Sequence, residues 1–418
     1  MKKKTLIGMM LLASPTITMA QNIIYPTPPS DNTVDKYFGI EVNDPYRPLE
    51  SDTAQATLAW VKAENKITTD YLSKIPFRAK LLNRMKELAN YEKYSAPWYN
   101  KHTQKWYFYR NNGLQNQSVL YVMNRLGDEK KAQIFLDPNK LSTDGTVALK
   151  SISFSNNGKY AAYAISRSGS DWQEFYVIDT NSGKLLNDHI KWAKFSNAAW
   201  LGDGFYYSAY DAPSPGNELS NVNSVQKIYY HKIGTPQSED ILFYQNPEQP
   251  MRFYTLGVNE DETMMFLIES GAGQGNGLYV RNLKQEGSQF IQLNANLEAQ
   301  CNPIKTIGDK IYILTNEKAP TNKLVVTDIH HPSKADWKTV IPANSNVLED
   351  VAFVDGKLIL TYMQDAYSHS YLYSIDGKQL KEIKLPTVGS ASFTGNYERP
   401  EVFYSFTSFT EPTSVYQY

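Results

Sequence analysis

The spacing of apolar residues changes near Asn90 and divides the chain into two regions. Before this point, apolar residues recur every three or four positions over 54–72 and 78–89: Leu58, Val61, Ile67 and Leu72, then Leu81, Leu82, Met85 and Leu88. This spacing predicts two amphipathic helices, each with an apolar face that needs a surface to lie on. After Asn90 the helical spacing stops, and short alternating runs predict β-strands.

A unit of two alternating runs separated by turns recurs along residues 91–418. Examples are NNGKYAAYAIS followed by EFYVIDTNSGK, and DGKLILTYMQD followed by SYLYSIDGK. Comparable runs begin near seven residues, 44 to 59 positions apart: Trp106, Tyr160, Phe205, Met264, Ile311, Leu358 and Val402. The period is typical of one propeller blade, so we predict a mainly β fold, a seven-bladed β-propeller preceded by a short helical N-terminal arm. Two stacked β-sandwiches are the alternative.

The last alternating run, at Val402, has no second run after it. In a closed propeller the missing strands can come from the start of the same region, and we expect them near Tyr94 to Tyr109. The predicted organisation therefore has three parts: a leader at 1–20, an arm at 21–90 and a propeller at 91–418.

The leader resembles a secretory signal peptide. Lys2, Lys3 and Lys4 precede a short apolar run, and Thr18-Met19-Ala20 offers small residues for cleavage before Gln21. We expect an exported protein, periplasmic or secreted, with no membrane span after cleavage; an uncleaved anchor is the alternative. Cleavage would lower Lys+Arg from 42 to 39 against 43 Asp+Glu, a net charge of −4. With no basic run in the remainder, nucleic acid is a poor partner.

Residues suited to catalysis or metal binding do not form a recognisable motif. The sequence has no G-x-S-x-G nucleophile elbow, so we assign no catalytic residue and expect the chain alone to be inactive. His330 and His331 are adjacent, and neighbouring side chains on a strand point to opposite faces, so we expect a solvated turn and no metal site. The glycine-rich stretch at 271–277 is expected to be a hairpin loop, and Cys301 a small buried residue. No cofactor is implied.

One dense stretch in the arm indicates an ordered structure that docks on another domain. YFGIEVNDPYRPLE places five residues in a restrained turn: Asp44, Pro45, Tyr46, Arg47 and Glu50. Pro45 restricts the backbone, and the Arg47 guanidinium can bind a carboxylate with two hydrogen bonds. We expect these residues to take part in interdomain docking.

Several stretches, taken in order from about Asp35 to Tyr418, resemble the prolyl oligopeptidase family of serine peptidases. They include DKYFGIEVNDPYRPLE, GLQNQSVLYV, SNNGKYAAYAISRSGSDWQEFYVID, QKIYYHKIGTPQSEDILFY and SFTEPTSVYQY. The resemblance implies a seven-bladed propeller inserted into an α/β-hydrolase domain that carries the Ser, Asp and His triad. It also implies substrate-cavity positions at Phe243 and, through its loop, Trp172. Pro48 departs from the tryptophan that is usual in the family, and we expect this change to loosen the arm's contact with its partner domain.

The resulting functional hypothesis is the N-terminal portion of a prolyl oligopeptidase-like serine endopeptidase, a truncated fragment that supplies the gating propeller. Its implied partners are short proline-containing peptides, in the intact enzyme, and an α/β-hydrolase domain, in cis or as a separate chain. The alternative is a stand-alone exported propeller that binds peptides or glycans without catalysis. The arm favours the first hypothesis, because a pure binding propeller needs neither DPYRPLE nor two docking helices.

Overall fold

The computed structural model describes residues 23–418, so the leader predicted at 1–20 lies outside the described residues. The chain divides into two compact units. One holds the described residues up to Arg84 together with Pro215–Ser220, and the other holds Met85–Ser214 and Asn221–Tyr418. No helix among residues 23–418 is long and apolar enough to cross a membrane.

The first unit, the arm, combines a β-hairpin with helices. Its elements are β1 (Val34–Tyr37), β2 (Ile40–Asn43), the 3-10 helix η1 (Arg47–Glu50), α1 (Gln55–Ser73) and the start of α2 (Arg78–Ala89). The two helices that the apolar spacing predicted are therefore confirmed, within one residue at each end. Within residues 23–84, Thr57 is the one buried side chain, so this unit has almost no core of its own.

The hairpin turn of the arm is made by Phe38 and Gly39. Tyr37 pairs with Ile40, which leaves two residues in the loop, and both have positive φ angles, 52° for Phe38 and 87° for Gly39. Such a turn matches the twist of the two strands, but a bulky residue rarely adopts a positive φ. The turn presents Phe38 to solvent with its side chain fully exposed.

The second unit is mainly β and forms a β-propeller built from antiparallel strands. Its first sheet has five strands: β3 (Lys93–Tyr94), β4 (Trp98–Asn100), β5 (Lys105–Asn111), β6 (Val119–Met123) and β7 (Gln133–Leu136). Its second sheet has eight strands: β8 (Val147–Phe154), β9 (Tyr160–Arg167), β10 (Trp172–Asp179), β11 (Leu185–Lys194), β12 (Ala199–Leu201), β13 (Gly204–Ala209), β14 (Lys227–Lys232) and β15 (Ile241–Gln245).

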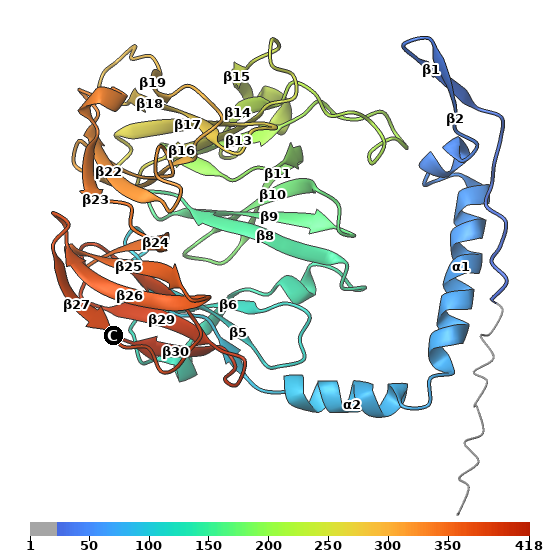
Figure 1. Ribbon diagram of the computed structural model, residues 1–418, viewed down its shortest axis with the longest axis horizontal. Helices are drawn as coiled ribbons and strands as arrows, with labels where there is room; N and C mark the ends of the chain where they lie inside the picture. Colours follow the sequence, from blue (N-terminus) through green and yellow to red (C-terminus); the bar gives the residue numbers. More distant parts are fainter. Residues whose placement is uncertain (1–22) are drawn as a thin grey trace, which may run out of the picture. The chain divides into compact units, whose positions relative to one another are not determined.

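Smaller sheets complete this unit in chain order (Figure 1). One consists of β16 (Phe253–Val258), β17 (Met264–Ser270), β18 (Asn276–Asn282) and β19 (Ile291–Asn294). The next consists of β20 (Cys301–Ile307), β21 (Lys310–Thr315), β22 (Lys323–Asp328) and β23 (Lys338–Ile341). The last two are β24 (Val347–Val354), β25 (Lys357–Gln364), β26 (Tyr367–Ser374) and β27 (Gln379–Ile383), then β28 (Ser390–Gly395), β29 (Val402–Thr407) and β30 (Ser414–Gln417).

Short 3-10 helices occupy some of the connections. They are η2 (Glu129–Lys131), η3 (Pro138–Lys140), η4 (Gln237–Glu239) and η5 (Lys334–Asp336). Across residues 85–418, five sheets have three to five strands, the size of a single propeller blade, and the sixth has eight.

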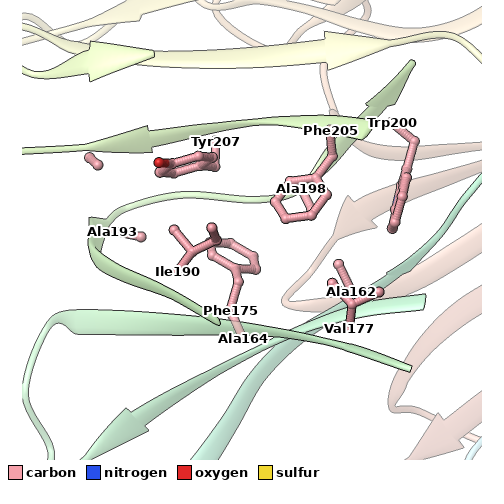
Figure 2. Close-up of a cluster of buried hydrophobic side chains, with 11 residues drawn as sticks. Ala162, Ala164, Phe175, Val177, Ile190, Ala193, Ala198, Trp200, Phe205 and Tyr207 are labelled. Carbon is pink, nitrogen blue, oxygen red and sulfur yellow. The ribbon is translucent and has the colours of Figure 1, made fainter. Parts of the chain in front are cut away.

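Buried apolar clusters lie inside the eight-stranded sheet and also link each sheet to the next. Phe175 and Ile190 of β10 and β11 pack against Phe205 and Tyr207 of β13, and Figure 2 shows these side chains facing one another. Equivalent clusters join the later sheets, and a final one joins Phe403 of β29 to Trp106 and Phe108 of β5. Because the last sheet packs back on the first, the sheets form a closed ring and not two stacked sandwiches.

The ring closes differently from our sequence expectation. Residues 93–111 pair within the first sheet, through β3, β4, β5 and β6, and not with β29. The run at Val402 is also followed by a further strand, β30, which pairs with β29. Closure therefore rests on side chains: the rings of Trp106 and Phe403 meet edge to face at 6.1 Å, and the Arg399 guanidinium lies 4.0 Å from the ring centre of Tyr99.

Candidate functional site

An aromatic cluster surrounds Trp172, one of the residues singled out from the sequence. Trp172 begins β10, and its ring meets Trp192 at 5.4 Å and Tyr210 at 6.3 Å, both edge to face. The Lys194 ammonium lies 4.8 Å from the centre of the Trp172 ring, close enough for a cation–π interaction. Trp172 is half-buried, so the cluster keeps part of its surface open to solvent.

The sequence did not single out Phe195, which extends this cluster outward. Phe195 follows β11, has a φ of 51° and is 50% exposed. Its ring meets Phe253 edge to face at 5.3 Å, and the Lys194 ammonium lies 5.7 Å from its centre. We define the aromatic surface as Trp172, Trp192, Lys194, Phe195, Tyr210 and Phe253. Its members come from 172–253 and meet only after folding.

The stretch KWAKFS does not predict this geometry, because its polar and apolar residues alternate as in an ordinary β-strand. In the structure, Trp192 has a φ of 59° and Phe195 one of 51°, so the backbone turns twice over four residues. Positive φ angles at bulky residues are uncommon and cost free energy, and they are often found where a side chain is held for function. Half-exposed aromatic rings beside a cation can stack on peptide side chains, including proline rings, and attract a carboxylate.

Phe243, the second substrate-cavity candidate, lies elsewhere in the propeller. It is on β15, an outer strand of the eight-stranded sheet, and is half-buried. Its ring lies 4.7 Å from Tyr206 and 6.4 Å from Phe290, neither of which belongs to the aromatic surface. Phe243 also joins the buried cluster between β13 and β16–β17. The structure therefore does not bring Phe243 and Trp172 together.

Two of the docking candidates of the arm, Asp44 and Glu50, pair with a third, Arg47. Arg47 Nε lies 2.6 Å from Asp44 Oδ2 and 3.4 Å from Glu50 Oε1. Its Nη2 donates to Asp35, on β1, a partner that the sequence analysis did not identify. Hydrogen bonds to Asp44 and then to Asp35 raise the pKa of the guanidinium. The hairpin brings Asp35 to a residue twelve positions away, so Arg47 connects β1 to the turn before η1.

Around this charged centre the arm exposes large apolar side chains. Tyr46 is 54% exposed, beside Pro45 in the same turn. The helices and the connection between them present a further exposed set, which continues into the second unit at Met85 and Leu88: Leu58, Val61, Leu72, Phe77, Leu81, Leu82, Met85 and Leu88. Few contacts hold the segments together, among them Trp60 Nε1 to the Pro26 carbonyl at 3.3 Å and Thr57 Oγ1 to the Pro48 carbonyl at 3.2 Å.

A buried histidine between two aspartates is the strongest acid–base cluster in the propeller. His231 Nδ1 lies 2.7 Å from Asp240 Oδ1, and Nε2 lies 3.0 Å from Asp188 Oδ1. Burial opposes its charge, but the hydrogen bonds to Asp188 and Asp240 outweigh burial and raise the pKa of His231 to about 9. Its side chain is fully buried, so this cluster joins β11 to β14 and cannot meet a substrate.

Other sequence expectations can be located directly. Cys301 is fully buried, and His330 and His331 are exposed next to the end of β22, as predicted. The glycine-rich stretch connects β17 to β18 and begins the latter, as a hairpin loop should. No group of three potential metal ligands occurs in the part of the chain that the structure describes.

Comparisons with known proteins agree on one family. Residues 25–418 match the family model described as prolyl oligopeptidase, N-terminal beta-propeller domain. A prolyl endopeptidase of Elizabethkingia meningoseptica is 40% identical over 396 residues, which are 94% of this chain and 55% of that protein. Prolyl oligopeptidase A of Amanita bisporigera is 32% identical, over 94% of this chain and 56% of that protein.

Solved structures give the same result. Prolyl oligopeptidase B from Galerina marginata, bound to a 35mer hydrolysis and macrocyclization substrate, superposes with a TM-score of 0.81 at 30% identity. The superposition covers 94% of this chain and 58% of that one. The chain thus spans about half the length of the curated relatives that it matches.

Proposed function

Because this chain belongs to the prolyl oligopeptidase family and spans its N-terminal β-propeller domain, we propose that it supplies the propeller and docking arm of a serine endopeptidase. The intact enzyme would cleave short peptides after proline. The Ser, His and Asp of the reaction would come from an α/β-hydrolase domain, since the 418 residues hold no G-x-S-x-G motif. The chain alone is expected to be inactive.

The exposed apolar surface of the arm carries this proposal. Within residues 23–84 the only buried side chain is Thr57, while Phe38 is fully exposed and Leu81 and Met85 are 52% and 58% exposed. Soluble proteins rarely expose so many large apolar side chains without a partner. We propose that residues 21–90 dock on the hydrolase domain, with Asp44, Pro45, Tyr46, Arg47 and Glu50 fixing the shape of the contact.

We propose that the aromatic surface faces the bound peptide. Its half-exposed rings offer stacking surfaces for proline, and Lys194 offers a positive charge. Trp172 would then belong to the substrate cavity, as the family resemblance implies. We keep Phe243 as a second candidate for the substrate cavity. It packs against the buried cluster that contains Tyr206. If the aromatic surface contacts the peptide, the substitution Trp172→Ala should raise the KM for a proline-containing peptide more than Phe243→Ala does.

We also propose that the propeller has seven blades. The eight-stranded sheet is joined in its middle, between β11 and β13, by one residue pair, Ala193 and Ala209. Its two four-stranded halves enclose a buried cluster between them, as neighbouring sheets do elsewhere in the ring. Division at that pair gives two blades, which with the five smaller sheets make seven.

Export to the periplasm or the medium is a further part of the proposal. It is supported by Lys2, Lys3 and Lys4, by the apolar run behind them, and by the small residues before Gln21. Amino-terminal sequencing of the exported protein would test it: a first residue of Gln21 is expected, and an intact leader would contradict it.

Reconstitution with a separate hydrolase domain tests the main proposal. Residues 21–418 are mixed with the part of the Elizabethkingia meningoseptica prolyl endopeptidase that lies outside the matched 396 residues. We expect a complex on size exclusion and hydrolysis of a fluorogenic peptide after proline. Leu81→Asp should weaken the complex about tenfold or more, because it places a charge in an apolar contact.

A matched control is Leu380→Asp, since Leu380 is 47% exposed but lies on β27 of the propeller. This variant should leave the complex unchanged. If no complex forms and the chain alone binds proline peptides, the stand-alone binding propeller becomes the better description. The aromatic surface with its lysine is the observation that would then account for binding.

A further inference from the structure

Lys194 carries a positive charge that is not paired with an acidic side chain. Its ammonium lies 4.8 Å from the ring centre of Trp172 and 5.7 Å from that of Phe195. In the part of the chain that the structure describes, no carboxylate lies within ion-pair distance of the Lys194 nitrogen. By contrast, Lys227, which begins β14, pairs with Asp211 at 2.5 Å. A cation–π contact holds an ammonium in place without removing its charge, so Lys194 can still bind an anion.

Strand pairing fixes this ammonium beside the ring. Lys194 ends β11 and lies directly opposite Trp172, the first residue of β10, in the antiparallel ladder. Side chains of two opposite residues lie on the same face of a sheet, close enough to interact. Lys194 is also half-buried. A lysine held in this way loses less side-chain entropy on binding a ligand than one that extends freely into solvent.

A fully buried glutamine holds the end of β11 that carries Lys194. Gln226 Nε2 donates to the Lys194 carbonyl at 2.8 Å, and Gln226 Oε1 accepts from the amide of Tyr254, on β16, at 2.6 Å. One side-chain amide thus connects β11 to β16. This connection is costly to break, because a lost partner would leave a polar group buried without a hydrogen bond.

A second set of hydrogen bonds holds the residues that follow Lys194. The amide of Ser196 donates to Gln173 Oε1 at 3.0 Å, and the Ser196 hydroxyl accepts from the amide of Ser208 at 2.8 Å. Ser208 donates its own hydroxyl to the Tyr254 carbonyl at 2.7 Å. Gln173 and Ser208 are 9% and 2% exposed, so little water competes for these bonds. They support the unfavourable positive φ of Phe195.

We propose that Lys194 binds a carboxylate of the peptide at the aromatic surface, and that Gln226 positions it for this contact. The carboxylate can belong to a free C-terminus or to an aspartate or glutamate side chain, which offer the same charge and acceptor oxygens. The neighbouring rings would cover the apolar part of the same peptide. The inference deepens the proposed function and rests on it for the identity of the ligand as a peptide, but not for the geometry of the turn.

Peptide affinity tests this site in residues 21–418 without a hydrolase domain. One short proline-containing peptide with an uncharged dye is made with a C-terminal carboxylate and with a C-terminal amide. A second pair, both amides, has glutamate or glutamine after the proline. In at least one pair, the peptide with the carboxylate should bind about fivefold more tightly, measured by fluorescence anisotropy, and that pair identifies the source of the carboxylate. A preference in neither pair, or no binding of any peptide, would overturn the proposal.

Variants of Lys194 show whether this residue causes the preference. Lys194→Met should abolish it and leave the affinity for the uncharged peptides unchanged, whereas Lys194→Arg keeps a cation beside the rings and should retain it. Lys227→Met is the matched control, because the lysine that it removes is already paired with Asp211. A preference that survives Lys194→Met would assign the binding to another cation and overturn the proposal.

Gln226→Met tests the positioning role. It should reduce the preference for the carboxylate, because the end of β11 loses its hydrogen bond, while the uncharged peptides bind as before. Gln237→Met is the control, since Gln237 also binds β11, through the N–H and C=O groups of Lys191, both at 3.0 Å. An equal loss of affinity for all peptides in Gln226→Met would indicate general damage and contradict positioning.

The test of this site is independent of the test of the main proposal. Binding is measured without hydrolysis, so the carboxylate preference can be absent while the reconstituted complex still cleaves peptides. Conversely, the preference can appear in residues 21–418 even if no complex with the hydrolase domain forms.

Discussion

The propeller buries many of its large apolar side chains, whereas the arm leaves most of its own exposed to solvent. In the propeller, Tyr107, Phe175, Phe205 and Phe406 are almost completely buried. In the arm, Phe38, Phe77 and Leu81 are mostly exposed to solvent, and an ion-paired arginine connects its segments in place of a core. The propeller therefore holds the contacts that stabilise it, while the arm has a defined shape and little stability of its own. Substitutions of the same chemical kind should consequently have unequal effects in the two regions.

The largest expected effect is in the core between β10 and β13. Phe205 is fully buried and its ring lies 5.1 Å from Trp200 and 5.8 Å from Phe175. Phe205→Ala leaves a cavity there and should lower the free energy of unfolding by about 3–5 kcal/mol, measured by urea unfolding. A change below about 1 kcal/mol would show that the core relaxes around the site and would weaken the contrast with the arm.

The next effect concerns pH and the buried histidine of the propeller. The pKa of His231 is about 9 in the folded chain, against an ordinary value of 6.5. A raised folded pKa gives stability that is complete below about pH 6.5 and is lost as the pH rises through about 9. The loss should be on the order of 3 kcal/mol, followed by urea unfolding at several pH values.

The matched variant is His231→Gln, which cannot carry the charge. It should be destabilised near pH 6, because Asp188 and Asp240 lose a buried cationic partner, and its stability should change less between pH 6.5 and 9. The same pH slope in both proteins would assign the effect to another group.

A smaller effect is expected at the charged centre of the arm. Arg47→Met leaves Asp35, Asp44 and Glu50 close together without a cation, so the hairpin should loosen. Limited proteolysis should then cut within residues 23–84 faster while the propeller remains intact. Lys66→Met is the control, since Lys66 pairs with Asp70 on the surface of α1. Faster cutting in both variants would argue against a special role for Arg47.

The smallest effect is expected on the apolar face of α2. Leu81→Ala should change the free energy of unfolding of the chain by no more than about 0.5 kcal/mol, because Leu81 is already 52% exposed. The same substitution should weaken the complex with the hydrolase domain, which size exclusion can measure. A loss comparable to that of Phe205→Ala would mean that the arm has a core after all.

The sequence predicted the elements better than the contacts between them. Helices at 54–72 and 78–89 appear as α1 and α2, because an apolar stripe with helical spacing is a local property. The repeat also indicated a propeller. The closing strands were misplaced, because the pairing of 93–111 with β29 or with its own sheet depends on distant packing that spacing does not encode.

The candidate site shows the same limit. Arg47 was expected to bind a carboxylate, and Asp44 and Glu50 were named with it, because all three lie in one short turn. Asp35 was missed because the hairpin brings it near, and Phe195 because a positive φ at a phenylalanine has no signature in the sequence. The buried His231 pairs with residues 43 positions before and nine after it, which a sequence motif does not reveal.

The contact that closes the ring also sets the order in which the protein can fold. Trp106 and Phe403 meet edge to face although about 300 residues separate them, so bringing them together costs much more chain entropy than forming any hairpin. During synthesis from the N-terminus, the arm hairpin and the early sheets can form while Phe403 has not yet been made. Ring closure is therefore the latest and slowest step we expect, and until it occurs the faces of the first and last sheets stay open to misassociation.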